Sequence, residues 1–337
     1  MDKAITLNPD VPPHELENIV RQAEQAGFTH CYVADQGFSR DVYVTLAMLA
    51  CATQTIRLGP GITHPYTRHA VVTAISIATL DEVSDGRAFL GLGAGGSRSL
   101  VPMQIERTKP MERCRETVEI CRGLWKGEPV NYSGEFFHLA SAHPGFACRQ
   151  DIDVHWAARG PKMLALGGEI ADVNILHAIP DFELGSVVQH VFEGARRSGR
   201  NPKLQYAVTH VFDEDSRQSA RERTVYRLVD SSEAVKKQLS LSETMIAEMR
   251  HQVTNQGLSA ASQLVSDEIL SHYTLDGSPE ECARKLRPLI AENRLTGITF
   301  EVHSFPQAAE IIERGARILS ILENGSSSDQ APQLSGS

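Results

Sequence analysis

The chain has 337 residues, of which 41% are hydrophobic and 22% are charged. A chain of this size and ordinary composition folds as one large domain or two medium ones, and it is not disordered, collagen-like or a disulfide scaffold. Asp and Glu number 42 against 33 Lys and Arg, a formal net charge of -9. This balance argues against the basic face of a general nucleic-acid-binding protein.

The cysteines show no CxxC pair and no companion histidines at zinc spacing, which predicts reduced thiols and neither a disulfide framework nor a structural metal. They are Cys31, Cys51, Cys114, Cys121, Cys148 and Cys282. The N-terminus lacks the apolar segment of a signal peptide. The longest mostly apolar stretch, 42–52, is far shorter than the ~20 residues of a membrane span. We therefore expect a cytoplasmic protein without a membrane partner.

Short apolar runs alternate with helix-length amphipathic segments along almost the whole chain, which favours βα units and a parallel sheet. The first half predicts strands at 4–7, 31–34, 56–62 and 88–92. It predicts helices from about 13 up to Gly27, over 42–53 with Asp41 as N-cap, over 71–83, and from about 110 to 126. No clean helix is expected over 97–109, and this polar connection is long enough to be functional.

The second half continues the alternation with two additions. Strands are predicted at 154–157, 174–179, 205–212 and 298–303, and helices at 161–171, 182–196, 279–292 and 307–322. A β-hairpin is expected over 130–139, and the polar helical pattern over 216–271 predicts an inserted bundle of two to four helices. The tail 325–337 is rich in Ser, Gly and Gln and is expected to be disordered.

Eight strands, each followed by a helix, match a (β/α)8 TIM barrel better than a doubly wound sheet. We expect a single α/β barrel domain over 1–324, with the insertion at about 213–271 and the short hairpin as its additions. In such barrels the chemistry lies at the carboxyl ends of the strands. The residues that follow each predicted strand are therefore the candidate site.

The segment Gly91-Leu-Gly-Ala-Gly-Gly96 matches the letters GxGxxG after the fourth strand. Classical dinucleotide binding uses such a segment in the first βα unit, with a helix that starts at the third glycine. Here the segment follows the fourth strand and no clean helix is expected after it, so dinucleotide binding is disfavoured. Two interpretations stay open: the glycines let the strand end approach a flat ligand, or they form a turn.

The segment Ala158-Arg-Gly-Pro161 joins the fifth strand to its helix. Pro161 suits the first helical turn, Gly160 permits close approach, and the helix N-terminus offers free N–H groups and partial positive charge to an anion, with Arg159 as a further donor. The alternative is a short βα turn in which Arg159 faces solvent.

Two further strand ends carry polar residues. Asp35 and Gln36 follow the second strand, where a carboxylate orients a ligand or caps a nearby helix. His64 and His69 follow the third strand, but no third ligand stands at recognised spacing, so capping or pocket lining is favoured over metal binding.

Five segments in fixed order carry a resemblance. They read ADQGFSRDVY at 34–43, LGPGITHPYTRH at 58–69, ATLDEVSDGR at 78–87, LGLGAGG at 90–96 and AARGPKM at 157–163. Together they resemble the bacterial luciferase-like superfamily of flavin- and deazaflavin-dependent oxidoreductases, within it the methylenetetrahydromethanopterin reductase type.

The resemblance implies a barrel that holds coenzyme F420, a deazaflavin, or alternatively FMN, with the ring over the ends of strands three and four. It also implies a cis peptide bond between Gly61 and Ile62. The implied cofactor-binding residues are Asp35, Gly61, Ile62, Thr63, Gly93, Ala94 and Gly95 around the ring, and Ala158, Arg159, Gly160, Pro161, Ala178 and Ile179 around the phosphate. Arg98, Arg107 and Lys109 are candidates for the anionic tail or are solvated loop charges.

The implied activity is hydride transfer between F420 and a small organic substrate at an imine, iminium, carbonyl or enone carbon. Asp35 and Gln36 are the catalytic candidates, although related enzymes keep histidine where Gln36 stands and glutamine does not titrate near neutral pH. The alternatives are an FMNH2-dependent two-component monooxygenase, which requires a partner flavin reductase, and a non-catalytic flavin-binding protein. The resemblance also implies a homodimer.

Overall fold

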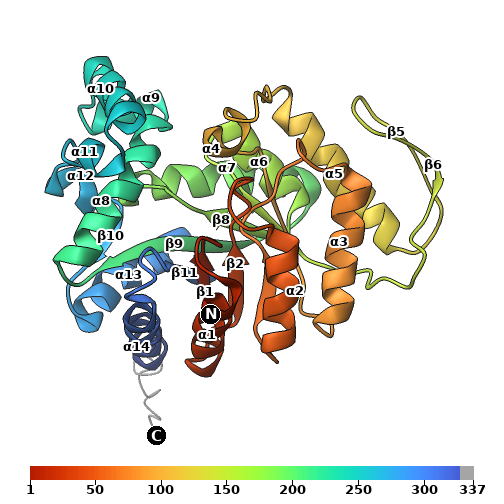
Figure 1. Ribbon diagram of the computed structural model, residues 1–337, viewed down its shortest axis with the longest axis horizontal. Helices are drawn as coiled ribbons and strands as arrows, with labels where there is room; N and C mark the ends of the chain where they lie inside the picture. Colours follow the sequence, from red (N-terminus) through yellow and green to blue (C-terminus); the bar gives the residue numbers. More distant parts are fainter. Residues whose placement is uncertain (327–337) are drawn as a thin grey trace, which may run out of the picture.

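Eight parallel strands form the inner cylinder of the computed structural model, which describes residues 1–326 (Figure 1). The strands are β1 (Asp2–Leu7), β2 (His30–Val33), β3 (Arg57–Pro60), β4 (Leu90–Gly93), β7 (Val154–Ala157), β8 (Val173–Leu176), β9 (Lys203–Val211) and β11 (Gly297–Glu301). Their order is β3-β2-β1-β11-β9-β8-β7-β4, and bridges from Leu58 to Ala88 and from Thr63 to Leu92 join the two ends. The predicted (β/α)8 barrel is confirmed.

Helices surround this cylinder, and a separate group of helices lies beside it (Figure 1). The surrounding elements are α1 (Pro13–Gln25), α2 (Val42–Ala52), α3 (Ala70–Val83), α4 (Ser97–Leu100), α5 (Pro110–Trp125), α6 (Pro161–Ile170), the 3-10 helix η1 (Asp181–Glu183), α7 (Leu184–Ser198), α13 (Pro279–Asn293) and α14 (Ala308–Ser326). The separate group is α8 (Glu214–Val229), α9 (Glu233–Gln238), α10 (Glu243–Asn255), α11 (Leu258–Ser262) and α12 (Asp267–Ser271). The predicted hairpin forms from β5 (Val130–Ser133) and β6 (His138–Ala142), which pair antiparallel.

Polar side chains set where several helices begin. The Asp41 carboxylate accepts hydrogen bonds from the backbone N–H groups of Tyr43 and Val44, each at 3.0 Å, so this residue caps α2 as predicted. Ser278 and Glu281 form a reciprocal capping box at the start of α13. These local bonds supply partners for backbone donors that the first helical turn leaves free.

The barrel interior is filled by an aromatic layer below the carboxyl ends of the strands. Phe89 stacks on His155 with ring centroids 4.1 Å apart, and the Tyr32 hydroxyl lies 2.8 Å from Nδ1 of the same histidine. Burial lowers the pKa of His155, so the ring is neutral. Ala4 and Ile175 complete this cluster, against which Ile62 and Ala157 pack from the mouth side.

The structure corrects several sequence-based expectations. The insertion contains five helices rather than two to four, because Ser232, Ser242 and Ser266 each cap a new helix start and divide the polar helical pattern. A strand that was not predicted, β10 (Thr274–Asp276), pairs with β9. A single helical turn, α4, forms within 97–109, where none was expected. Residues 325 and 326 continue α14, and the remainder of the predicted tail lies outside the described residues.

One ion pair joins α3, the start of β4 and the segment before β7. Asp81 is 5% exposed and accepts hydrogen bonds from Nε and Nη2 of Arg149 at 2.9 and 2.8 Å and from the Ala88 N–H at 3.1 Å. Arg149 also donates to the carbonyl oxygen of Ala88 at 3.1 Å. The pair therefore satisfies both backbone groups of Ala88 at the point where the chain enters β4.

Asp81→Ala removes the acceptor of the Arg149 guanidinium and of the buried Ala88 N–H, so we expect the free energy of unfolding to fall by about 2–4 kcal/mol. Asp151 is the matched control, because it accepts from the same arginine at 3.4 Å but is 87% exposed. Asp151→Ala should cost less than about 0.5 kcal/mol. Urea denaturation of both variants measures the difference, and equal losses would contradict the assigned role of Asp81.

Candidate active site

The mouth of the barrel has a floor of small residues on the side of β3 and β4. A Cβ atom on Gly93 would lie 2.1 Å from Cδ1 of Ile62, and one on Gly91 would lie 1.8 Å from the carbonyl oxygen of Pro60. These strands therefore require glycine where the end of β3 crosses over β4. The Gly61–Ile62 peptide bond is cis, as the resemblance implied. Ile62 is half-buried, and its side chain covers the β4 glycines and the aromatic layer.

Thr63 connects this floor to the end of β2. Its hydroxyl donates to Oδ2 of Asp35 at 2.7 Å, and its own side chain is fully buried. Its N–H donates to Gly91 and its carbonyl oxygen accepts from Gly93, each at 3.0 Å. Asp35 thus holds the residue that follows Ile62, which makes it a positioning group for the floor.

Gln36 and His64 lie next to this connection. The Gln36 amide donates to Oδ1 of Asn8 at 2.8 Å, which fixes it between the ends of β1 and β2. His64 is buried and its pKa is lowered by burial, against the opposing effect of the nearby Asp35. The β carbon of the same histidine would lie 3.3 Å from a Cβ placed on Gly95, whose φ is +72°. The loop after β4 therefore packs on the loop after β3, with Ala94 half-buried beside it.

The start of α6 has the features of an anion site. Gly160 is the N-cap and offers no side-chain cap, Pro161 occupies the first turn, and a Cβ on Gly160 would meet nothing within 4 Å. Arg159 and Ala178, from two neighbouring strand ends, line one cavity of about 20 Å³. Ala178 has φ +58°, in the left-handed region, and β8 ends at Leu176, earlier than the predicted strand 174–179.

Two carboxylates lie near Arg159 at this cavity. Asp230, at the C-cap of α8, lies 3.7 Å from Nη2 of Arg159, and Glu183 lines the same space. Burial raises the pKa of Glu183, while its hydrogen bond from Ser232 and the charge of Arg159 lower it. Arg159 is 41% exposed. An exposed ion pair of this kind contributes little to stability, so the arginine can exchange this partner for an anion at small cost.

Two predicted residues support the cavity from behind. Ala158 packs against the hydrophobic core, and Ile179 is 3% exposed with its carbonyl oxygen accepting from the Tyr206 hydroxyl at 3.2 Å. They position the two strand ends rather than present polar side chains.

The residues that form the opposite wall of the mouth were not predicted from the sequence. Glu301, the last residue of β11, is 2% exposed and binds Nη2 of Arg227 at 2.5 Å, Nε2 of His177 at 2.8 Å and the Thr209 hydroxyl at 3.0 Å. Burial raises the pKa of Glu301, but Arg227 and His177 hold it well below its usual range. Glu301 is the last residue of β11 and His177 directly follows β8, so both lie at carboxyl ends of strands, where a barrel places its chemistry.

The three basic residues of the loop after β4 have different surroundings. Arg98 places its guanidinium 5.4 Å from the ring centroid of Tyr226 on α8. Arg107 donates to the carbonyl oxygen of Gly95 at 3.2 Å, and Lys109 pairs with Glu135 of the hairpin turn. Of these candidates, Arg98 is the one that reaches the α8 side of the mouth.

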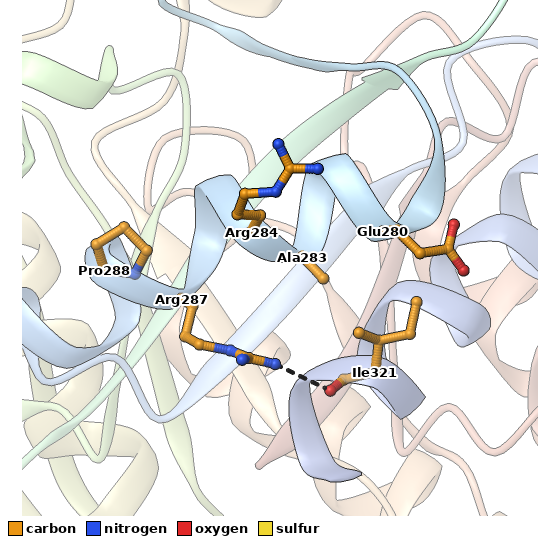
Figure 2. A pocket seen from close by; sticks show the side chains of 6 residues that line it. All are labelled: Glu280, Ala283, Arg284, Arg287, Pro288 and Ile321. Atoms are coloured by element: carbon orange, nitrogen blue, oxygen red, sulfur yellow. Dashed lines mark hydrogen bonds between the residues drawn. The ribbon is translucent and has the colours of Figure 1, made fainter. Parts of the chain in front are cut away.

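A larger cavity, of about 360 Å³, lies in the outer ring of helices between α13 and α14 (Figure 2). Arg287 donates to the carbonyl oxygen of Ile321 at 3.3 Å across it. Its lining residues are Glu280, Ala283, Arg284, Arg287, Pro288 and Ile321. None of them follows a barrel strand, so this cavity is not the predicted site.

His69 has a structural role: its Nδ1 accepts from the Val71 N–H at 3.2 Å and caps α3. Within residues 1–326, no group of three or more His, Cys, Asp or Glu is arranged to hold a metal ion. In the same part of the chain, no helix has the length and apolar composition needed to cross a bilayer.

Comparison with known proteins agrees with this architecture. Residues 2–294 match the family model described as luciferase-like monooxygenase. The 5,10-methylenetetrahydromethanopterin reductase of Archaeoglobus fulgidus is 33% identical over 302 residues, which cover 86% of this chain and 90% of that protein. The F420-dependent glucose-6-phosphate dehydrogenase of Nakamurella multipartita is 27% identical over 202 residues, which cover 56% of this chain and 60% of that protein.

A solved structure shows the same fold. The coenzyme F420-dependent tetrahydromethanopterin reductase of Methanopyrus kandleri superposes with a TM-score of 0.87 at 24% identity, covering 95% of this chain and 99% of that chain. With the family model matching residues 2–294, the chain belongs to the luciferase-like monooxygenase family.

Proposed function

We propose that the protein is an oxidoreductase that transfers a hydride between coenzyme F420 and a small organic substrate, at an imine, iminium, carbonyl or enone carbon. The observation that carries this proposal is the floor formed by Ile62 over the glycines of β4, with the uncapped start of α6 beside it. The names of the similar proteins support this choice: one is a 5,10-methylenetetrahydromethanopterin reductase, and another is an F420-dependent dehydrogenase.

The residues at the mouth fit a flat ring with a phosphate-bearing chain. Gly93 leaves room for Ile62 to lie flat across the strand end, and the open space at Gly160 adjoins free N–H groups and Arg159. When bound, a reduced deazaflavin supplies the hydride from C5, while the protein supplies orientation and electrostatics.

We assign different roles to the residues around the proposed ring. Ile62 backs the ring, and Thr63, held by Asp35, fixes the position of Ile62. We propose that Gln36, whose amide donates to Asn8, hydrogen-bonds the ring or the substrate and does not transfer a proton. We therefore assign Asp35 to positioning and Gln36 to binding at the reacting face.

A second candidate function is the FMNH2-dependent two-component monooxygenase, which the description of the family model favours. In that case FMN would occupy the same floor, and a partner flavin reductase would supply the reduced cofactor. A non-catalytic flavin-binding protein is the third candidate, and it would bind a cofactor without turning over any substrate.

We propose that residues 1–324 act as one domain and that the substrate is selected by the inserted helices α8–α12 and the hairpin β5–β6. The five inserted helices follow β9 directly, and a barrel presents its specificity on the loops after its strands. All six cysteines are free thiols, which supports a reducing compartment such as the cytoplasm.

Fluorescence and absorbance titration of the purified protein with oxidised F420 and with FMN tests the proposed cofactor. We expect saturable binding of F420 at least tenfold tighter than that of FMN. Anaerobic assays with reduced F420 and a panel of carbonyl, imine and enone compounds should then show hydride transfer without oxygen. Binding of FMN alone, with an oxygen-dependent product, would instead identify the monooxygenase.

Arg159→Ala should weaken F420 binding about 5- to 20-fold, because it removes a charge-assisted hydrogen bond to the phosphate at a partly exposed position. Arg196→Ala is the matched control, since that exposed arginine lies in the last turn of α7. Fluorescence titration gives both dissociation constants. Unchanged affinity in the Arg159 variant would contradict the phosphate assignment.

We propose a homodimer that buries the outer faces of α2 and α3. Val44 and Met48 on α2 are 63% and 37% exposed, and Val72 and Val83 on α3 are 48% and 45% exposed. The two helices are neighbours in the outer ring (Figure 1). Exposed apolar side chains gathered on adjoining helices are typical of an interface.

The double variant Val44→Glu, Val72→Glu should convert the dimer to a monomer, because it places unpaired charges in the apolar contact. Val101→Glu is the control, since Val101 is 69% exposed and lies outside these helices. Size-exclusion chromatography with light scattering measures the mass. A double variant that keeps the dimeric mass would rule out this interface, and a monomeric wild type would rule out the dimer.

A further inference from the structure

Helix α8 presents one face to the carboxyl end of β11. The Ser219 hydroxyl donates to the carbonyl oxygen of His303 at 2.9 Å, and Arg227 binds the Glu301 carboxylate at 2.5 Å. Residues four apart share one face of a helix, so Arg223, midway between them, lies over the same strand end. The structure thus directs this arginine toward the barrel mouth.

Arg223 has no ion-pair or hydrogen-bond partner among the described residues, although it is only partly exposed. Burial lowers the pKa of Arg223, and the charges of Arg227 and Arg98 act in the same direction. Glu301 and Asp10 oppose this effect, but Glu301 already binds Arg227 and His177. The mouth therefore holds a cation whose nearest buried carboxylate is already paired.

Arg98 brings a second cation to the same turn of α8. It comes from α4, on the opposite side of the mouth, and its guanidinium lies 5.4 Å from the ring centroid of Tyr226. Tyr226 stands three residues after Arg223 on α8, so Arg98 lies at the turn of the helix that carries Arg223. Positive charge is thus concentrated at this wall in a chain whose formal net charge is -9.

We propose that Arg223 and Arg98 bind the carboxylate or phosphate group of an anionic substrate at the α8 wall of the mouth. This inference rests on the proposed function, because that substrate must extend from this wall to the ring over Ile62. In the strand order, β11 lies on the far side of the barrel from β3 and β4, so the two walls enclose the substrate between them.

The energetics favour a binding role over a structural one. A partly buried guanidinium without a partner loses some of its hydration, and this costs free energy unless a partner compensates it. No carboxylate of the described chain supplies that partner to Arg223, so a ligand anion is the group that completes its bonding. The tail of F420 also carries carboxylates, and the test must separate the two sources.

Isothermal titration with inorganic phosphate tests the site in cofactor-free protein. The Arg159→Ala variant serves as the background, because the start of α6 is itself expected to bind phosphate. We expect one phosphate site in this background and at least tenfold weaker binding after Arg223→Gln is added. Arg221→Gln is the matched control: that neighbouring arginine pairs with Asp267 at 2.5 Å, and its loss should leave phosphate binding unchanged.

Phosphate binding that is unchanged by Arg223→Gln would overturn the proposal. F420 titration of Arg223→Gln with Arg159 intact separates the two anion sources. Unchanged F420 affinity supports a substrate site, whereas a tenfold loss would assign the arginine to the cofactor tail and overturn it. If the wild type binds phosphate through Arg223 but does not bind F420, the proposed cofactor fails while the anion site stands.

Thermal unfolding provides a readout that does not depend on any ligand. Arg223→Met should keep or raise the melting temperature, by roughly 1–3 °C, because it removes an unpaired charge. Arg227→Met should lower it, because Glu301 then stays buried without its main partner. A fall after Arg223→Met as large as that after Arg227→Met would show a structural role and overturn the proposal.

Discussion

The mouth of this barrel depends on one steric constraint, the absence of side chains on the inner faces of β3 and β4. Phe89 occupies the position that a side chain on Gly59 would take. Pro60 and Ile62 occupy the corresponding positions at Gly91 and Gly93. A Cβ at any of these three glycines would come within 2.4 Å of the atom that now fills its place. The aromatic layer and the crossing of β3 over β4 are thus consequences of glycine, and they produce the apolar floor on which the proposed ring lies.

The two sides of the mouth are built by different forces. The floor around Ile62 is held by packing, by backbone hydrogen bonds of Thr63 and by the bond from its hydroxyl to Asp35. The α8 wall is held by a buried carboxylate, Glu301, which binds Arg227 and His177. Breaking such a buried pair leaves a charge without compensation, so these ionic contacts stabilise the wall. In the proposed function, the ring lies on the apolar side and a polar substrate on the charged side.

The barrel could be predicted because the alternation of apolar runs and amphipathic helices is a local signal in the sequence. Ile62, Arg159 and Ala178 could be placed near the mouth because they lie at or just after the ends of predicted strands and because the family resemblance implies them. The sequence did not reveal Glu301, Arg227 and Arg223 as a group. Two of them lie on an inserted helix and one on a strand 74 residues away from its arginine partner, so only the folded chain brings them together. The count of inserted helices was wrong for a related reason: single serine caps divide a polar helical pattern without any change of composition.

A crystal structure of the protein with oxidised F420 would show directly where the cofactor binds. We expect the deazaflavin ring to contact the Ile62 side chain over β4, and the phosphate to lie at the start of α6 beside Gly160 and Arg159. A ring bound away from Ile62, for example in the cavity between α13 and α14, would contradict the assignment of the barrel mouth as the active site.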